Sequence, residues 1–228
     1  MYDIDYNGTT GKMLGVAITT RPAIPVPQKR GEYVQVAGRD GSLFVSDGTY
    51  QDIQFEIQMN FVRAEHFWHD TARRVRNWLS GSGILRLGND PEWHYRVKNA
   101  SSSQMDNISK KGAVFTASFV CEPFQYHDGG QVFMDVEQVS LNPFYESQPV
   151  YEIHGTGEFV LEINGNEVSG TSDGVAYIDT ERMIAYKDSQ TRVVTSGDFE
   201  GLYLKNGQNA ISINNGFTLK IKPNWRSL

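Results

Sequence analysis

The chain has 228 residues, of which 39% are hydrophobic and 21% are charged. This composition excludes a disordered chain, and the length exceeds the roughly 100 to 200 residues usual for one domain, so we expect two domains. The 21 basic and 27 acidic residues give a net charge of −6. That balance excludes the basic surface needed for direct, sequence-specific nucleic-acid binding or for adsorption to an anionic membrane.

The N-terminal sequence also argues against membrane insertion and secretion. The apolar stretch Met13–Ile18 is far shorter than the roughly 20 residues that span a bilayer. The acidic start, Met1–Asp5, lacks the basic segment of a secretory signal. We therefore expect no membrane segment and a protein that folds where it is made. The lone Cys121 lies in an alternating apolar pattern, which predicts a buried thiol.

The first distinctive segment is residues 21–31, RPAIPVPQKRG. Its prolines lack a backbone donor and favour extended geometry in the residues before them, which predicts an exposed arm or an edge. Such an arm can lie along a neighbouring subunit and donate strand hydrogen bonds there, or it can be an intrachain loop. The candidate oligomer-interface residues are Pro22, Pro25, Val26, Pro27, Gln28, Lys29 and Arg30.

A tight turn is predicted soon after this arm. Its residues are Gly38, Arg39, Asp40 and Gly41. The two glycines can adopt backbone angles that bulky residues avoid, and the charged pair between them can pair or cap locally. We treat these four residues as a structural turn.

The middle of the chain predicts one strand, one helix and then further strands. Gln51–Val62 alternates apolar and polar side chains, which is typical of a strand with one buried and one solvent-exposed face. Apolar residues then recur at three- and four-residue steps over Arg63–Leu79, which predicts a helix that Gly81 and Gly83 end. The remaining segments are expected as strands at Ile84–Leu87, Trp93–Lys98 and Ala113–Cys121, with Ala100–Lys111 as a loop.

After the sequence NPFYESQP, Asn142–Pro149, the chain changes to short strand-like runs broken by Asn and Gly. We expect domains at residues 1–140 and 141–228, the second a sandwich of short strands. Its expected strands are Tyr151–Ile153, Glu158–Ile163, Gly174–Asp179, Arg182–Lys187, Gly201–Leu204, Asn209–Ile213 and Phe217–Ile221. Asn-Gly pairs at 164–165, 206–207 and 215–216 predict hairpin turns, because both residue types tolerate positive φ.

No arrangement of side chains in the sequence supports catalysis. His66 and His69 are three residues apart on the expected helix, but nothing elsewhere completes a four-ligand metal set. The only cysteine of the sequence lies in an expected core strand. We therefore expect no enzyme, no metal and no cofactor, and we favour a role in assembly.

Several segments, in order, resemble the distal tail protein (Dit) family of long-tailed, non-contractile bacteriophages. In the first half the matching segments are the arm from Arg21-Pro22 to Pro27, the Val36–Gly41 turn, Gly48-Thr49-Tyr50, Trp78-Leu79 before Gly81-Ser82-Gly83, and Phe119–Phe124. In the second half they are Asn142–Pro149, Ile178-Asp179, Leu204–Asn209 and Pro223–Arg226. The family usually has Pro at the position of Ala37 and Gly at that of Lys205, so two turns depart from its pattern.

The resemblance implies a mainly β protein: an N-terminal β-sandwich-like domain with one α-helix, and a C-terminal galectin-like β-sandwich. It implies a structural hub of the tail tip, a hexameric ring as described for the family, that joins the tail tube to the tip and adsorption apparatus. The implied partners are other copies of the chain, the tail tube protein, the tail-associated tip or lysin protein, and receptor-binding or baseplate proteins. The implied location is the virion, after synthesis and assembly in the host cytoplasm.

A carbohydrate-binding module that contributes to host-surface adhesion is the alternative function. The aromatic residues available to stack on sugars are Tyr151, Tyr177, Tyr186, Tyr203 and Trp225. Alternate strand positions usually bury such rings, so core packing is the competing interpretation of these five residues.

Overall fold

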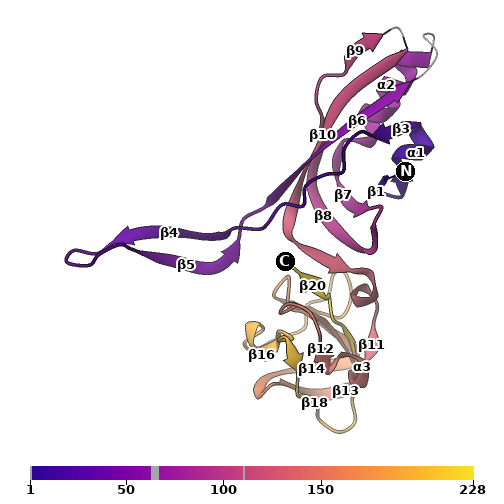
Figure 1. Cartoon of the computed structure of the whole chain (residues 1–228). Coiled ribbons are helices and arrows are strands. Elements are labelled where there is room, and N and C mark those ends of the chain that lie inside the picture. Colours follow the sequence, from indigo (N-terminus) through magenta and orange to yellow (C-terminus); the bar gives the residue numbers. More distant parts are fainter. Residues whose placement is uncertain (1, 63–66, 110) are drawn as a thin grey trace. The chain divides into compact units, whose positions relative to one another are not determined.

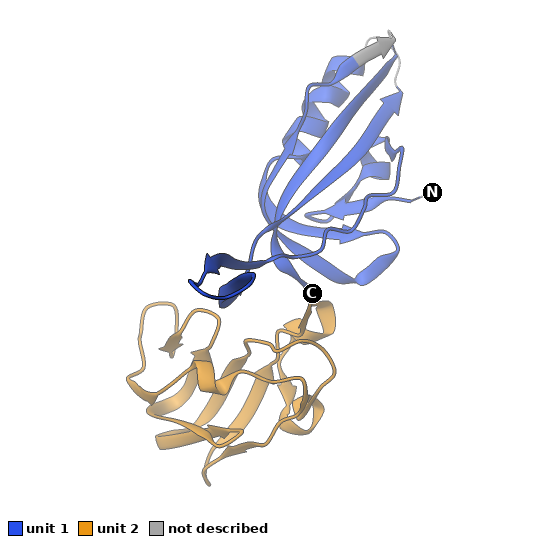
Figure 2. Ribbon diagram, turned by 60° about the vertical axis from the view of Figure 1, so that its left-hand side comes forward, with its two compact units in different colours: residues 1–125, 228 blue, residues 126–227 orange. Residues whose placement is uncertain are grey.

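The computed structural model describes residues 2–62, 67–109 and 111–228 and divides the chain into two compact units (Figure 1, Figure 2). Unit 1 comprises residues 1–125 and 228, and unit 2 comprises residues 126–227. The boundary expected at residue 140 therefore falls inside unit 2. The described chain is mainly β with one long helix, so the expected fold class is confirmed. None of its helices is long and apolar enough to cross a membrane.

Unit 1 is built on a curled sheet with the strand order β2-β1-β7-β8-β10-β6-β3. Its strands are β1 (Ile4–Tyr6), β2 (Thr9–Thr10), β3 (Val16–Ile18), β6 (Ile53–Val62), β7 (Gly81–Leu87), β8 (Asp90–Ser102) and β10 (Gly112–His127), with β9 (Asp106–Ser109) on β10. The two ends of this order, β2 and β3, are joined by the four-residue helix α1 (Gly11–Leu14). The sheet must therefore curl for such a short segment to join its edges.

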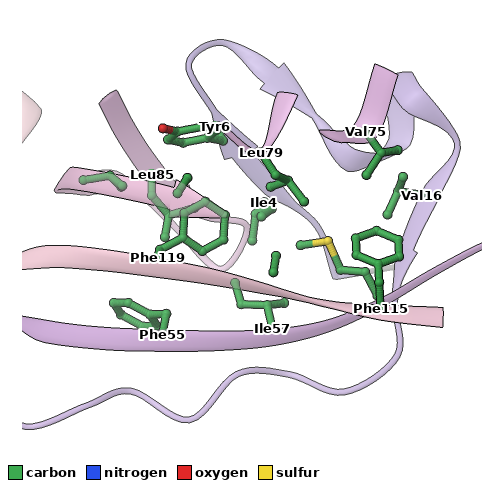
Figure 3. Close-up of a cluster of buried hydrophobic side chains, with 14 of the residues drawn as sticks. Ile4, Tyr6, Val16, Phe55, Ile57, Val75, Leu79, Leu85, Phe115 and Phe119 are labelled. Atoms are coloured by element: carbon green, nitrogen blue, oxygen red, sulfur yellow. The ribbon is translucent and has the colours of Figure 1, made fainter. Parts of the chain in front are cut away.

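The core of unit 1 follows from the alternation in β6 and β10. These strands pair in continuous antiparallel register from Val62↔Gly112 to Ile53↔Cys121. Every second side chain of β6, including Phe55 and Ile57, is buried, which confirms the strand predicted for this segment. Figure 3 shows these residues with Phe119 among the other buried side chains.

Helix α2 (Trp68–Trp78) packs on this core through Thr71, Ala72 and Val75. Its last residue donates an indole hydrogen bond to the carbonyls of Tyr6 and Thr9, at 3.2 and 3.1 Å. The predicted helix is thus present, although its expected first four residues, 63–66, lie outside the described residues. The two glycines expected to end it lie in β7 instead.

Unit 1 also carries β4 (Lys29–Gln35) and β5 (Ser42–Tyr50), which pair only with each other. Figure 1 shows this hairpin extending away from the curled sheet of the same unit. Neither strand is among those expected from the sequence.

Unit 2 contains a second antiparallel sheet with the order β11-β19-β13-β14-β15, to which β16 and β18 add on β14 and β13. Its strands are β11 (Met134–Asp135), β13 (Val150–Ile163), β14 (Asn166–Asp179), β15 (Ile184–Tyr186), β16 (Thr195–Gly197), β18 (Ile211–Ile213) and β19 (Thr218–Lys222). The smaller elements are η2 (Asp128–Gln131), α3 (Val136–Val139), β12 (Leu141–Asn142), η3 (Glu200–Leu202), β17 (Gly207–Gln208) and β20 (Arg226–Ser227). Asn164 and Gly165, with φ of 53° and 85°, form the predicted turn between β13 and β14.

The segment that the sequence presents as a linker, Asn142–Pro149, is built into unit 2. Asn142 and Ser147 are fully buried, and the Arg226 guanidinium bonds the Glu146 carbonyl at 2.6 Å and Gln148 Oε1 at 2.9 Å. Residues before it also belong to this unit, because β11 pairs with β19 and Val139 is a core residue. Prolines in a packed segment look like a linker in sequence, which is why the expected boundary lies too far along the chain.

Three further expectations differ from the structure. Two of the short strands expected in the second domain are parts of the 14-residue strand β13. The loop expected at Ala100–Lys111 contains the end of β8 and the strand β9. Two of the four residues Gly201–Leu204, expected as a strand, lie in the 3-10 helix η3. The secondary structure of these segments depends on contacts with other strands, which local composition does not encode.

Candidate assembly interface

The hairpin β4–β5 is the candidate functional site, because it is the most exposed element with regular structure in unit 1. Its strands pair from Gly31↔Ser46 to Gln35↔Ser42. Every residue from 31 to 49 is exposed to solvent. A hairpin of two strands is marginally stable in water unless something packs on it.

The turn predicted from the sequence is the tip of this hairpin. Gly38 and Gly41 have φ of +80° and +75°, a region that L side chains rarely adopt. A Cβ added at either glycine would meet no atom within 4 Å, so the requirement is conformational rather than steric. The Arg39 amide closes the turn by donating to the Val36 carbonyl at 3.2 Å.

The proline arm leads into this hairpin and has no strand structure of its own before Lys29. Residues 24–27 line a groove of about 310 Å³ in unit 1, whose other walls include Ile53, Tyr95 and Pro123. The Gln51 amide donates to the Gln28 carbonyl at 2.8 Å, which ties the base of the hairpin together. The candidate interface residues are therefore divided: Pro25, Val26 and Pro27 lie on the groove, whereas Lys29 and Arg30 lie in β4.

Large apolar side chains cover both faces of the hairpin. Cross-strand partners share a face, so Tyr33 and Phe44 lie on one side of the hairpin. The pair Val34 and Leu43 lies on the other side, together with Val45. The exposed fractions are Tyr33 74%, Val34 38%, Val36 46%, Leu43 43%, Phe44 40% and Val45 47%. Exposed apolar patches of this kind mark interaction sites on soluble proteins.

The sequence analysis missed this two-sided hairpin, although a signal was present. The apolar runs Tyr33–Val36 and Leu43–Val45 flank the predicted turn at equal distances, as two hairpin strands do. Leu43–Val45 is wholly apolar and only Gln35 interrupts the other run, so neither run marks one face of a strand. Only the structure reveals that both faces are exposed.

The five aromatic residues of the carbohydrate alternative do not form one surface. Tyr151 is fully buried, and its hydroxyl donates to the Leu202 carbonyl at 2.6 Å. Trp225 packs against His127 and Phe144. The rings of Tyr177 and Tyr186, the two residues that do meet, stack at 5.2 Å.

The Tyr177–Tyr186 pair lies next to polar groups on neighbouring strands. The Tyr177 hydroxyl donates to Glu152 Oε1 at 2.9 Å, and this hydrogen bond raises the pKa of the tyrosine. The His154 Nε2 atom lies 3.5 Å from the same carboxylate oxygen. The rings of Tyr177 and Tyr186 and the Glu152 carboxylate therefore lie side by side across neighbouring strands of the sheet.

The described residues show neither a cluster of metal ligands nor an exposed thiol. No group of three or more His, Cys, Asp or Glu within them is placed to hold a metal ion. His69 is exposed, and His66 lies outside the described residues. Burial raises the pKa of Cys121 to about 12, so this thiol is protonated at neutral pH.

The fold resembles that of a solved phage protein along the whole chain. The crystal structure of the Dit protein of phage SPP1, described as a paradigm of the hub adsorption apparatus in phages that infect Gram-positive bacteria, superposes with a TM-score of 0.71. The match covers 100% of this chain and 98% of the SPP1 chain, at 11% sequence identity. No protein-family model matches, and no curated protein matches by sequence. The chain therefore has a Dit-like fold, and the resemblance found in the sequence is confirmed at the level of the fold.

Proposed function

We propose that this protein is the structural hub of a long, non-contractile phage tail, where it joins the tail tube to the tip and adsorption apparatus. The observation that carries the proposal is the Dit-like fold over the full length of both chains. In this proposal the protein belongs to the virion, after synthesis and assembly in the host cytoplasm. The role requires surfaces for assembly and no reaction, in keeping with the protonated, buried Cys121.

In this proposal the hub is a closed ring of identical copies, most simply a hexamer. A head-to-tail interface closes into a ring only if its rotation divides the circle, and an arm that reaches a neighbour is suited to such a contact. The proline arm and the hairpin that follows it are the proposed connectors. The tail tube protein, the tip or lysin protein and the receptor-binding or baseplate proteins are the proposed partners of the ring.

The mass of the purified protein in solution tests this proposal. Light scattering over a range of concentrations, followed by negative-stain imaging, is expected to give a closed ring with a mass near six subunits. A strict monomer at every concentration, both alone and with the tail tube protein, would contradict the ring.

Carbohydrate binding is the second candidate function, and the Tyr177–Tyr186 pair beside Glu152 favours it. Aromatic rings stack on the apolar faces of sugars, and a carboxylate accepts hydrogen bonds from sugar hydroxyls. A glycan array is the test. Saturable binding that is lost in Tyr186→Ala and kept in Tyr203→Ala would support this function, and no saturable binding would exclude it.

A further inference from the structure

We propose that Asn215 is the site at which this chain loses a side-chain amide spontaneously, while its other Asn-Gly sequences are protected by the fold. Deamidation is fastest where glycine follows asparagine, because no side chain shields the glycine nitrogen. The sequence has four such pairs, which begin at Asn7, Asn164, Asn206 and Asn215. The structure gives these four side chains different surroundings.

The reaction needs a side-chain amide that is free to turn and a backbone amide that is free to attack. The nitrogen of the following glycine attacks the asparagine Cγ and loses its proton to solvent base. A succinimide ring forms, and the Cγ–Nδ2 bond breaks as ammonia leaves with a proton from solvent. Water then opens the ring at either carbonyl and leaves aspartate or isoaspartate. A hydrogen-bonded side chain must first break its bonds, which slows the attack.

Asn7 is held at both ends of its side-chain amide. Its Oδ1 atom accepts from the Ile84 amide at 2.9 Å, and its Nδ2 atom donates to the Ser82 carbonyl at 3.3 Å. The attacking group is also occupied, because the Gly8 amide donates to Asp5 Oδ1 at 2.7 Å. This exposed pair is therefore protected by its hydrogen bonds.

Two further pairs are restrained in the same way. Asn164 donates to Asn209 Oδ1 at 2.9 Å and accepts from the Ala210 amide at 2.9 Å. The Asn206 amide donates to the Phe144 carbonyl at 2.7 Å. In each case the side chain is tied to a distant part of unit 2 and cannot turn towards its own backbone without breaking that contact.

Asn215 has none of these restraints. Among the residues that the structure describes, neither its side chain nor the Gly216 amide has a hydrogen-bond partner, and both residues are exposed. A Cβ at Gly216 would meet no atom within 4 Å, so the approach to its nitrogen is open. The neighbouring side chain, Asn214, is the one that is fixed: it accepts from the Val160 amide at 2.9 Å and donates to the Glu158 carbonyl at 3.0 Å.

The backbone explains why this pair is left free. The sequence predicts a hairpin turn here, but β18 and β19 run in the same direction along one side of β13, with partners at Leu161↔Ile213 and His154↔Thr218. Residues 214–217 therefore interrupt what would otherwise be one strand. The Asn-Gly pair lies in that interruption, outside the ladder of backbone hydrogen bonds.

Ageing the folded, full-length protein at mildly alkaline pH tests the assignment. Mass spectrometry of proteolytic fragments measures the loss of each amide separately. Amide loss at Asn215 is expected to be at least about fivefold faster than at the other three pairs, which corresponds to breaking one hydrogen bond. In the urea-denatured protein the four pairs are expected to react at similar rates, because the protecting bonds are absent.

Two variants provide a matched comparison. Glutamine forms the cyclic intermediate far more slowly, because the ring would be larger. Asn215→Gln is therefore expected to remove most of the acidic species that ion-exchange chromatography resolves in the aged protein, and Asn206→Gln is expected to leave them. If the folded wild type loses its amide as fast at Asn7, Asn164 or Asn206 as at Asn215, the assignment is wrong. It is also wrong if all four stay intact in the folded protein while the denatured protein reacts.

Discussion

At the scale of single residues, Arg226 is an unusual case of a buried charge that holds a chain segment in place. It is 8% exposed and bonds the Glu146 carbonyl and the Gln148 side chain. Arg226→Ala leaves these half-buried acceptors without that donor, so we expect a loss of about 2 to 4 kcal/mol in the free energy of unfolding. Urea denaturation measures it. Arg182→Ala, whose side chain is 73% exposed, is the control and is expected to change stability by less than about 0.5 kcal/mol.

The burial of Cys121 predicts that the stability of the fold depends on pH. Burial, with smaller contributions from Asp52 and Glu122, raises its pKa from 9.0 to about 12. The folded state therefore binds the proton more tightly than the unfolded state, so the stabilisation is full below pH 9 and is lost as pH rises from about 9 to about 12. The urea midpoint of the wild-type protein is expected to fall across this pH window. The midpoint of Cys121→Ala is expected to fall less steeply. Equal slopes in both proteins would contradict a contribution from this thiol.

The same burial predicts the reactivity of this thiol. At pH 8 a disulfide reagent is expected to label Cys121 in denaturant and to leave it unlabelled in the folded protein. Rapid labelling of the native protein would show that the strand β10 opens readily.

At the scale of elements, α2 is tied to the first strands through Trp78. Its indole donates to the carbonyls of Tyr6 and Thr9. Trp78→Phe keeps an aromatic ring and removes the donor, so we expect a loss of about 1 to 3 kcal/mol in the free energy of unfolding. Arg73→Ala on the exposed side of the same helix is the control. Similar urea midpoints for both variants would show that the indole bond contributes little.

The backbone conformation at the hairpin tip predicts how a substitution there affects assembly. Gly38→Val forces a β-branched residue to adopt φ near +80°, at a cost of about 1 to 3 kcal/mol. Because the hairpin lies outside the core, we expect faster hydrogen exchange in β4 and β5 and weaker ring formation, with little change in global unfolding. Arg39→Val, at a residue whose φ is not positive, is the control. A ring as stable as wild type would show that the tip conformation is unimportant.

At the scale of the whole molecule, each unit has its own hydrophobic core. We therefore expect the fragment 126–228 to unfold cooperatively on its own and to remain monomeric, because the hairpin belongs to unit 1. Calorimetry and light scattering of the fragment measure both properties. Self-association of the fragment would place ring contacts in unit 2.

The sequence determined the local structure wherever burial follows a simple period. The alternation over Ile53–Val62 and the three- and four-residue steps before Leu79 predicted a strand and a helix, because one face of each element packs on a core. It also predicted the turn at Gly38–Gly41, since few residues other than glycine adopt such angles. The Dit-like fold followed from motifs spread along the chain, and the superposition supports it.

Contacts between distant parts of the chain determine which residues pack together and which remain exposed. The pairing of β1 with β7 joins residues some 80 positions apart. The pairing of β11 with β19 and the burial of Val139 put residues before 140 in unit 2, which begins at residue 126. An aromatic side chain in a strand is buried in the core at Phe115 and exposed on the hairpin at Tyr33. The physical reason is that periodicity reports a preference for burial, whereas burial itself depends on partners that lie far along the chain or in another copy.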